Sequence, residues 1–375
     1  MKNLPLLISN NSVSAPMKLL VENRCFVFRR INQNIDSKTI FEMIRFIATL
    51  TVKYTGMRLP IVFELKKCSF QDKLTYVLFE CLCEYLTEEC GHRVVVSLPD
   101  GKHIHTAGLR YSPLLCLSNH TEKNADAFKR KFSFDILQYH FRKVLLAENC
   151  EPTYLSKLFQ DVDDFQKNCG VDGECREKIS EVIAELVGNA VEHGDGNCLV
   201  DFDIAPNFIK NGSNEEFIGI NIVVMNFSSK SLGEALKDKI LYEEDLGSRY
   251  AVVKSAYEKH RGYFEDEYTQ EDFFNLMVFQ DKISGRGDSL LGGRGLTKLI
   301  ESLEKRSDAH MCYVVSNGRI LLFSPEYLNY NKGMWLGFNK ENNIFEKPAP
   351  EITGTFDFVF PGTAYNLNFV MQKEN

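Results

Sequence analysis

Two periods of apolar residues follow one another along the first part of the chain. Runs that alternate every second residue favour β-strands, and runs with apolar residues three and four apart favour amphipathic helices. The pattern predicts, in order, strand 17–29, helix 39–54, strand 59–66, helix 73–90 and strand 92–98. Strands that alternate with helices are typical of a small α/β domain.

The polar, charged segment 118–131 shows no apolar period. It marks the predicted boundary between two domains, residues 1–120 and residues 121–375. The second domain is also predicted to be α/β. Its predicted helices are 134–148, 153–168, 177–193 and 296–306, and its predicted strands are 198–204, 217–226, 311–316, 319–324, 355–360 and 365–370.

The composition limits the partners and the cellular compartment that we expect for the chain. Its 375 residues carry a formal net charge of −7, which argues against sequence-independent capture of nucleic acid. The 11 cysteines are scattered and lack paired zinc-binding spacings, so they favour a reducing compartment. No apolar run approaches the roughly 20 residues that a membrane span requires. We therefore expect a cytoplasmic protein that does not bind membranes.

The helix predicted at 177–193 carries the first candidate chemistry, in the stretch ELVGNAVEHGDGN. Glu185 and Asn189 are one turn apart on its polar edge. A carboxamide oxygen is a hard ligand that suits Mg²⁺. A carboxylate one turn earlier can accept a proton from water that attacks a phosphate. The alternative is the exposed edge of an ordinary amphipathic helix.

Two glycine-containing segments add to this candidate. Gly292, Gly293 and Gly295 precede a predicted helix, whose N-terminus is a ready anion site, and Arg294 can add a charged contact. Two Gly-Thr pairs, Gly354-Thr355 and Gly362-Thr363, each open a predicted strand. A glycine turn before a helix is often only a turn, so the ordered set matters more than any member.

Taken in order, ELVGNAVEHG, GGRGLTKLI and the late Gly-Thr pair resemble the GHKL ATPase superfamily, over roughly residues 135–375. This superfamily includes gyrase B subunits, mismatch-repair ATPases, sensor histidine kinases and anti-sigma serine kinases. The resemblance implies a two-layer α/β sandwich, with a mixed sheet and helices on one face, that binds Mg-ATP beneath a mobile lid. The lid would be the insertion at about 227–291, which is also compatible with a solvated surface or a partner site.

By position, the resemblance implies that Glu185 is the general base and Asn189 the Mg²⁺ ligand. It implies phosphate contacts for the second glycine box, which comprises Gly293, Arg294, Gly295 and Leu296. Thr363 or Thr355 would correspond to the threonine near the adenine, with Thr363 preferred. The first glycine box departs from the family pattern, because Asn226 replaces the aspartate that binds the adenine amino group.

Residues 1–120 resemble the STAS fold that bacteria pair with anti-sigma-type kinases, which implies a protein-interaction module. The leading hypothesis is an ATP-binding switch with slow hydrolysis that controls a protein partner, in bacterial stress signalling or phage defence. The alternatives are a protein serine kinase and a non-catalytic scaffold with a degenerate nucleotide site. A homodimer is a further option. His140 invites comparison with a phosphoacceptor histidine, but it lacks the acidic neighbour of that motif.

Overall fold

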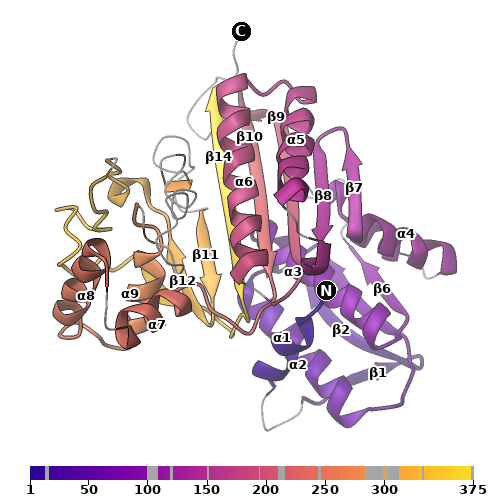
Figure 1. Cartoon of the computed structure of the whole chain (residues 1–375). Helices are drawn as coiled ribbons and strands as arrows, with labels where there is room; N and C mark the ends of the chain where they lie inside the picture. The colour runs from indigo at the N-terminus through magenta and orange to yellow at the C-terminus, as the bar shows by residue number, and fades with distance from the viewer. Residues whose placement is uncertain are drawn as a thin grey trace.

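The chain forms a mixed α/β structure, as the sequence predicts (Figure 1). This computed structural model describes residues 1–12, 17–98, 109–118, 121–149, 152–193, 195–209, 216–243, 246–281, 283, 299–300, 302, 312–331 and 333–372. Within these ranges, a four-stranded sheet lies in the N-terminal part and an eight-stranded sheet forms the centre of the remainder. A third sheet has two short strands, β3 (Asn34–Ile35) and β5 (Ser69–Phe70).

The four-stranded sheet has the order β1-β2-β4-β6. Its strands are β1 (Leu20–Glu22), β2 (Cys25–Ile31), β4 (Ile61–Lys66) and β6 (Val94–Ser97). Strands β2, β4 and β6 are parallel, whereas β1 is antiparallel to β2. The single strand predicted at 17–29 is therefore wrong. Asn23 and Arg24 both have positive φ, which makes the two-residue turn of a hairpin.

The N-terminal helices begin at side-chain caps. Asp36 accepts a hydrogen bond from the Thr39 N–H (2.9 Å) at the start of α2 (Ser37–Lys53). Asp72 accepts one from the Thr75 N–H (2.9 Å) at the start of α3 (Lys73–Glu84), which continues as a π-helical turn at Tyr85–Glu89. These caps satisfy N–H groups that have no partner within the helix, so both predicted helices form. The short helix α1 (Leu4–Asn10) precedes them.

The helix predicted at 134–148 is wrong, because this segment is a hairpin of β7 (Phe134–Leu137) and β8 (His140–Leu145). Leu137, Phe141 and Leu145 are four residues apart, a spacing that fits both the helical period and every second strand position. The polar segment before it is largely helix α4 (Glu122–Ser133), capped by Thr121. Its Phe128 and Phe132 are buried in the core.

The eight-stranded sheet is antiparallel throughout, with the order β13-β12-β11-β14-β10-β9-β8-β7, so the mixed sheet that the GHKL resemblance implies is wrong. Helices α5 (Pro152–Asn168) and α6 (Gly173–His193) cover one face of it (Figure 1). The predicted strand 355–360 is displaced, since only Thr353–Thr355 is a strand there. The remaining strands are β9 (Cys198–Ile209), β10 (Glu216–Asn226), β11 (Tyr313–Ser316), β12 (Arg319–Leu322), β13 (Thr353–Thr355) and β14 (Thr363–Gln372).

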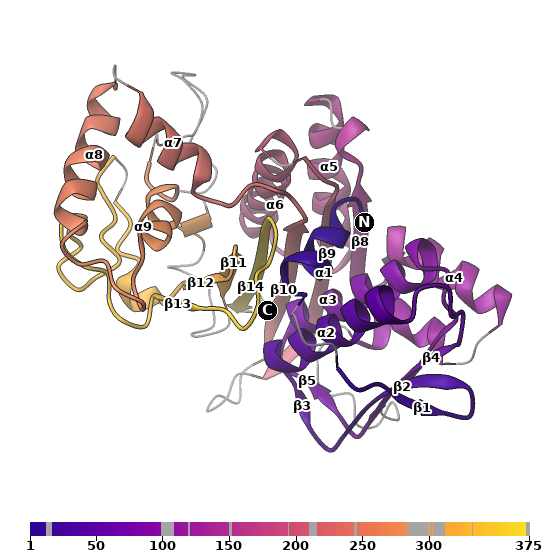
Figure 2. The same cartoon turned by 90° about the horizontal axis from the view of Figure 1, so that it is seen from below.

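The opposite face of this sheet is covered by the N-terminal part, so the two parts share one core (Figure 2). Three consecutive residues at the start of α3 contact three different strands. The Tyr313 hydroxyl of β11 donates to Asp72 Oδ2 (2.6 Å), and the Leu74 N–H donates to Asn366 Oδ1 of β14 (3.1 Å). Lys73 forms ion pairs with Asp201 and Asp203 of β9.

The described part of the insertion after β10 contains three helices. They are α7 (Glu234–Tyr242), α8 (Ser248–His260) and α9 (Gln270–Met277). They lie beside the β11-β12-β13 end of the sheet (Figure 1) and bury aromatic side chains in the core that α5 and α6 share. Among the described residues, no helix is both long and apolar enough to pass through a membrane.

Candidate functional site

Helix α6 carries the Glu185 and Asn189 pair in the predicted arrangement. Asp172 begins the helix by accepting hydrogen bonds from the N–H groups of Glu174 (3.0 Å) and Cys175 (3.1 Å). The apolar stripe of the helix is buried against the sheet, which leaves Glu185 and Asn189 half-buried at its edge. The Asn189 carboxamide donates to Glu185 Oε1 at 3.5 Å, so the two groups adjoin.

Asn226 joins this helix to the predicted threonine. It is the last residue of β10, is 4% exposed and pairs with Thr363 in the register of β10 and β14. Its Nδ2 donates to the carbonyl of Ala190 (3.3 Å), one residue after Asn189. Its Oδ1 accepts from the Thr363 N–H (3.3 Å). One amide therefore links α6, β10 and β14, and brings three of the predicted elements together.

The second Gly-Thr pair lies elsewhere. Thr355 is on the edge strand β13, which β12 and β11 separate from β14. Its hydroxyl accepts from Arg319 Nη1 (2.9 Å), and Arg319 also forms an ion pair with Asp272 (2.6 Å). Thr355 thus belongs to a structural contact between β12, β13 and α9, whereas Thr363 adjoins Asn226.

Glu185 lies near the strand that begins with Thr363. Tyr365, two residues further along β14, is 5% exposed. Burial raises the pKa of Tyr365, and the negative charge of Glu185 raises it further. The carboxylate proposed as a base is therefore close to β14.

The loop after Asn226, from Ser228 to Gly233, uses its backbone N–H groups in hydrogen bonds within the protein. Each N–H from Ser228 to Gly233 donates to an acceptor within the protein. The acceptors are, in order, Pro361 O (3.2 Å), Asp195 Oδ1 (3.1 Å), Ser228 Oγ (3.0 Å), Glu234 Oε2 (2.9 Å), Ser316 Oγ (2.9 Å) and Asn275 Oδ1 (3.0 Å). This loop therefore offers no free row of N–H groups to a phosphate.

The glycines on either side of this loop allow close backbone approach. A Cβ at Gly196 would lie 2.0 Å from the Phe227 carbonyl oxygen, and one at Gly362 would lie 2.3 Å from the Asn226 carbonyl oxygen. Asp195 holds the loop by accepting hydrogen bonds from the N–H and the hydroxyl of Ser229. Burial raises the pKa of Asp195, but the hydrogen bonds from Ser229 lower it more, so the net pKa is below the ordinary value. Asp195 and Gly196, which follow α6, thus support the loop.

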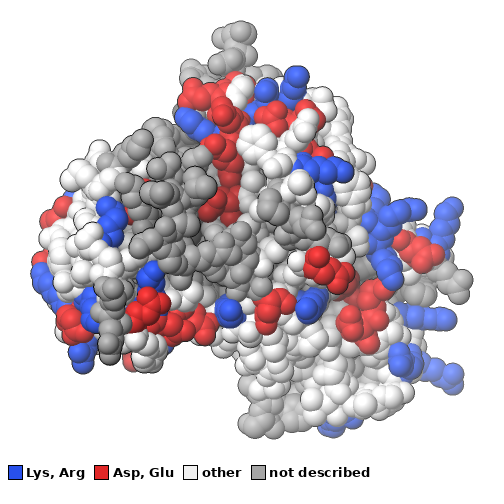
Figure 3. Space-filling model, viewed as in Figure 1, with Lys and Arg blue, Asp and Glu red and all other residues white. Residues whose placement is uncertain are grey.

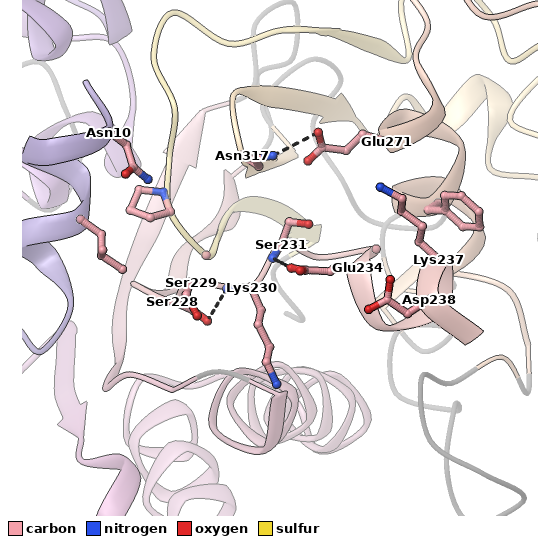
Figure 4. Close-up of a pocket in the computed structure, with 15 residues that line it drawn as sticks. Asn10, Ser228, Ser229, Lys230, Ser231, Glu234, Lys237, Asp238, Glu271 and Asn317 are labelled. Atoms are coloured by element: carbon pink, nitrogen blue, oxygen red, sulfur yellow. Dashed lines mark hydrogen bonds between the residues drawn. The ribbon is translucent and has the colours of Figure 1, made fainter. Parts of the chain in front are cut away.

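A pocket of about 440 Å³ opens at this end of the sheet, between α1, α7 and the β11-β12 turn (Figure 4). Lys230 and Lys237 supply its positive charge. Glu271 accepts a hydrogen bond from Asn317 (3.2 Å), and burial raises the pKa of Glu271. Sequence reasoning missed Lys237 and Glu271, because neither belongs to a motif and the helices that carry them come together only in the folded chain.

A second polar cluster lies between α3 and the sheet. His140, Asp201 and Asp203 have ligand atoms close enough together to hold a metal ion. The Lys73 ammonium, however, already forms ion pairs with both aspartates. Arg142 adds contacts to Glu80 (2.5 Å) and Asp201 (2.8 Å). Side-chain cations therefore neutralise this cluster. His140 is 1% exposed, which is unsuitable for a phosphoacceptor.

The second glycine box cannot be placed. Gly293, Arg294, Gly295 and Leu296 lie outside the described residues. Leu299 and Ile300, which follow them, are helical and fully buried in the core next to α6. The described positions of the predicted helix 296–306, which are 299, 300 and 302, are thus helical.

Comparison with protein-family models, curated proteins and solved structures gives no match. The resemblances to the GHKL ATPases and to the STAS fold stay predictions from the sequence.

Proposed function

We propose that the chain binds Mg-ATP at the end of the sheet where α6, β10 and β14 meet. The observation that carries this proposal is the position of Asn226, whose amide is hydrogen-bonded both to the Ala190 carbonyl and to the Thr363 N–H. Through these two bonds α6, β10 and β14 meet, although the bonded residues are 36 and 137 positions apart in the sequence. Asn189 directly precedes Ala190 on helix α6, and Glu185 lies one turn before Asn189.

In this proposal each residue has one role. Asn189 would be a ligand of Mg²⁺, which supplies neutralisation of the phosphate charge. Glu185 would accept the proton of the attacking water. Asn226 and Thr363 would define the adenine end, and the segment from Gly293 to Leu296 would contact the phosphates.

The residues of the site fit the metal-binding part of this proposal better than the phosphate-binding part. Glu185 and Asn189 are half-buried and provide hard oxygen ligands, which Mg²⁺ prefers. The loop from Ser228 to Gly233 contributes no free N–H groups, so phosphate contacts would depend on the glycines at 292–295. We infer slow turnover and a switch role, in which nucleotide binding alters the association of the helical insertion with a protein partner.

The same loop favours a second candidate, a non-catalytic scaffold. Both polar atoms of the Asn226 side chain are hydrogen-bonded within the protein, and an adenine would have to share them. A scaffold of this kind would keep the fold and its partner surface while binding no nucleotide.

Equilibrium titration of the full chain with ATP, with and without Mg²⁺, separates these candidates. We expect Mg²⁺-dependent binding that Asn189→Ala weakens by at least tenfold, because the metal loses a ligand. Asn168→Ala, an exposed asparagine at the end of α5, is the matched control and should bind as wild type does. Absence of binding by the wild-type chain would exclude the ATP proposal and favour the scaffold.

A second measurement tests the role of Glu185. We expect Glu185→Gln to abolish phosphate release while it retains Mg-ATP affinity, since the amide cannot accept the proton. Glu181→Gln, one turn earlier on the same helix, is the control and should keep wild-type turnover. Equal loss in both variants would contradict a catalytic role. Transfer of label to a protein instead of free phosphate would identify a serine kinase.

A further inference from the structure

Strand β7 is an open edge of the eight-stranded sheet. It is the last strand in the sheet order and pairs only with β8 among the described strands. Three of its four side chains are exposed and apolar: Phe134 (51%), Ile136 (49%) and Leu137 (37%). An edge strand has unpaired backbone N–H and C=O groups, which can pair with another chain.

This edge lacks the usual protection against pairing. Proteins generally place charges, prolines or bulges on exposed edge strands. The only charged residue of β7 is Asp135, which is half-buried and forms an ion pair with Lys131 (3.7 Å). The hairpin register has no bulge, and the strand contains no proline. An apolar edge without such protection is suited to binding an extended segment.

Positive charge lies at the end of α4, beside the edge. Helix α4 ends at the residue before β7 and carries Lys129, Arg130 and Lys131 near that end, whereas Lys123 and the acidic residues Glu122 and Asp126 lie in its first half (Figure 3, at the right). Lys129 pairs with Glu88, and Lys131 with Asp135. Arg130 is exposed and makes no ion pair with any described residue. The field beside β7 is thus locally basic on a chain whose net charge is −7.

We propose that β7 binds an extended acidic segment of a partner protein, which adds to the sheet as a ninth strand. Backbone hydrogen bonds would supply affinity, and apolar side chains of the segment would contact Phe134 and Ile136. Acidic side chains would complement Arg130 and its neighbours. A second copy of this chain fits less well, because the only acidic residue of a second β7 would be Asp135, which is already paired with Lys131 and cannot complement Arg130. The proposal does not depend on nucleotide binding.

The edge strand β1 provides a matched control. It is the outer strand of the four-stranded sheet, and its Val21 is as exposed (51%) as Ile136. Its neighbour Glu22 is paired with Arg29 (2.6 Å), so its charge is balanced. Val21→Lys therefore places a lysine on an exposed edge strand that has no excess of positive charge beside it. It tests whether such a change alone weakens peptide binding.

The experiment selects binders from a displayed library of random nine-residue peptides with the full wild-type chain, and removes those that also bind Ile136→Lys. We expect the remaining peptides to alternate apolar residues with Asp or Glu. Fluorescence anisotropy of a selected synthetic peptide should show at least tenfold weaker binding to Ile136→Lys and several-fold weaker binding to Arg130→Glu. Val21→Lys should bind as wild type does.

Two further readouts keep this test decisive. Hydrogen exchange should show slower exchange of the β7 amides when the peptide is bound, and circular dichroism should show that the variants are folded. The proposal is overturned if no β7-dependent peptide is obtained, or if the selected peptides are not acidic. It is also overturned if sedimentation shows a dimer that Ile136→Lys dissociates, because the occupant of the edge would then be a second copy.

Discussion

At the scale of single residues, Asn226 shows how one side chain can hold three elements together. Its two hydrogen bonds use both the donor and the acceptor of a carboxamide, whereas an ionised carboxylate could only accept. An aspartate here would leave the Ala190 carbonyl without its donor and place a negative charge beside it. The asparagine that departs from the family pattern is therefore the residue that fits its own surroundings.

We expect Asn226→Asp to lower the free energy of unfolding by about 1–3 kcal/mol near neutral pH, the cost of an unmatched buried acceptor. The carbonyl and burial should raise the pKa of the new carboxyl in the folded state. The loss should shrink as the pH falls through this raised pKa, because the protonated acid can donate again. Urea unfolding at neutral and acidic pH measures this, and a loss that does not depend on pH would contradict the assigned hydrogen bonds.

His140 provides a second residue with a predictable dependence on pH. Burial lowers the pKa of His140, but Asp201 and Asp203 raise it more, so the net pKa is above the ordinary value of 6.5. A raised pKa in the folded state stabilises the protein below the unfolded value, and this contribution is lost as the pH rises through the folded value. We therefore expect the stability difference between wild type and His140→Gln to fall from about pH 6 upward. A constant or increasing difference would contradict the predicted charge on His140.

The residues of the site were predictable where a motif fixed their spacing and unpredictable where only folding brought them together. Glu185 and Asn189 are one helical turn apart, so their proximity follows from the helix itself. Thr363 lies beside Asn226 and Thr355 does not, and only the strand register shows this difference. Lys237 and Glu271 line the pocket from two different helices, and no local pattern relates them.

At the scale of elements, the start of α3 acts as the attachment of the N-terminal part to the sheet. Asp72, Lys73 and Leu74 each contact a different strand, and Lys73 balances two buried carboxylates. The sequence predicts α3 and the strands, because their periods are clear. It does not predict this contact, because a lysine in the first turn of a helix is usually solvated. The hairpin β7-β8 was predicted as a helix because the spacing of its apolar residues fits both the helical period and the strand period.

We expect Lys73→Met to lower the free energy of unfolding by about 3–5 kcal/mol, because it leaves Asp201 and Asp203 without their shared cation in the core. Lys129→Met is the matched control, since Lys129 is exposed and its ion pair with Glu88 is screened by solvent. Denaturant unfolding of both variants measures the effect. Equal stability of the two variants would show that the buried ion pairs do not hold α3 to the sheet.

At the scale of the whole molecule, the two predicted domains share one hydrophobic core. One hydrophobic cluster contains apolar residues of the N-terminal part together with residues on the facing side of the sheet. The sheet residues include Leu199, Val223, Met225 and Val315. Two modules joined by a linker would each enclose their own core. Here one core needs both parts, so residues 1–120 act as a layer of the structure and can still offer an outer surface to partners.

We accordingly expect the full chain to unfold in a single calorimetric transition whose measured enthalpy equals the van't Hoff enthalpy. A fragment of residues 121–375 should not fold alone, because it exposes the apolar face that α2 and α3 cover and leaves Asp201 and Asp203 without Lys73. It should bind a hydrophobic dye and aggregate, and a co-expressed fragment of residues 1–120 should restore its solubility. Two separate transitions, or a soluble and folded 121–375 fragment, would show that the parts are independent domains and that their contact is only a docking interface.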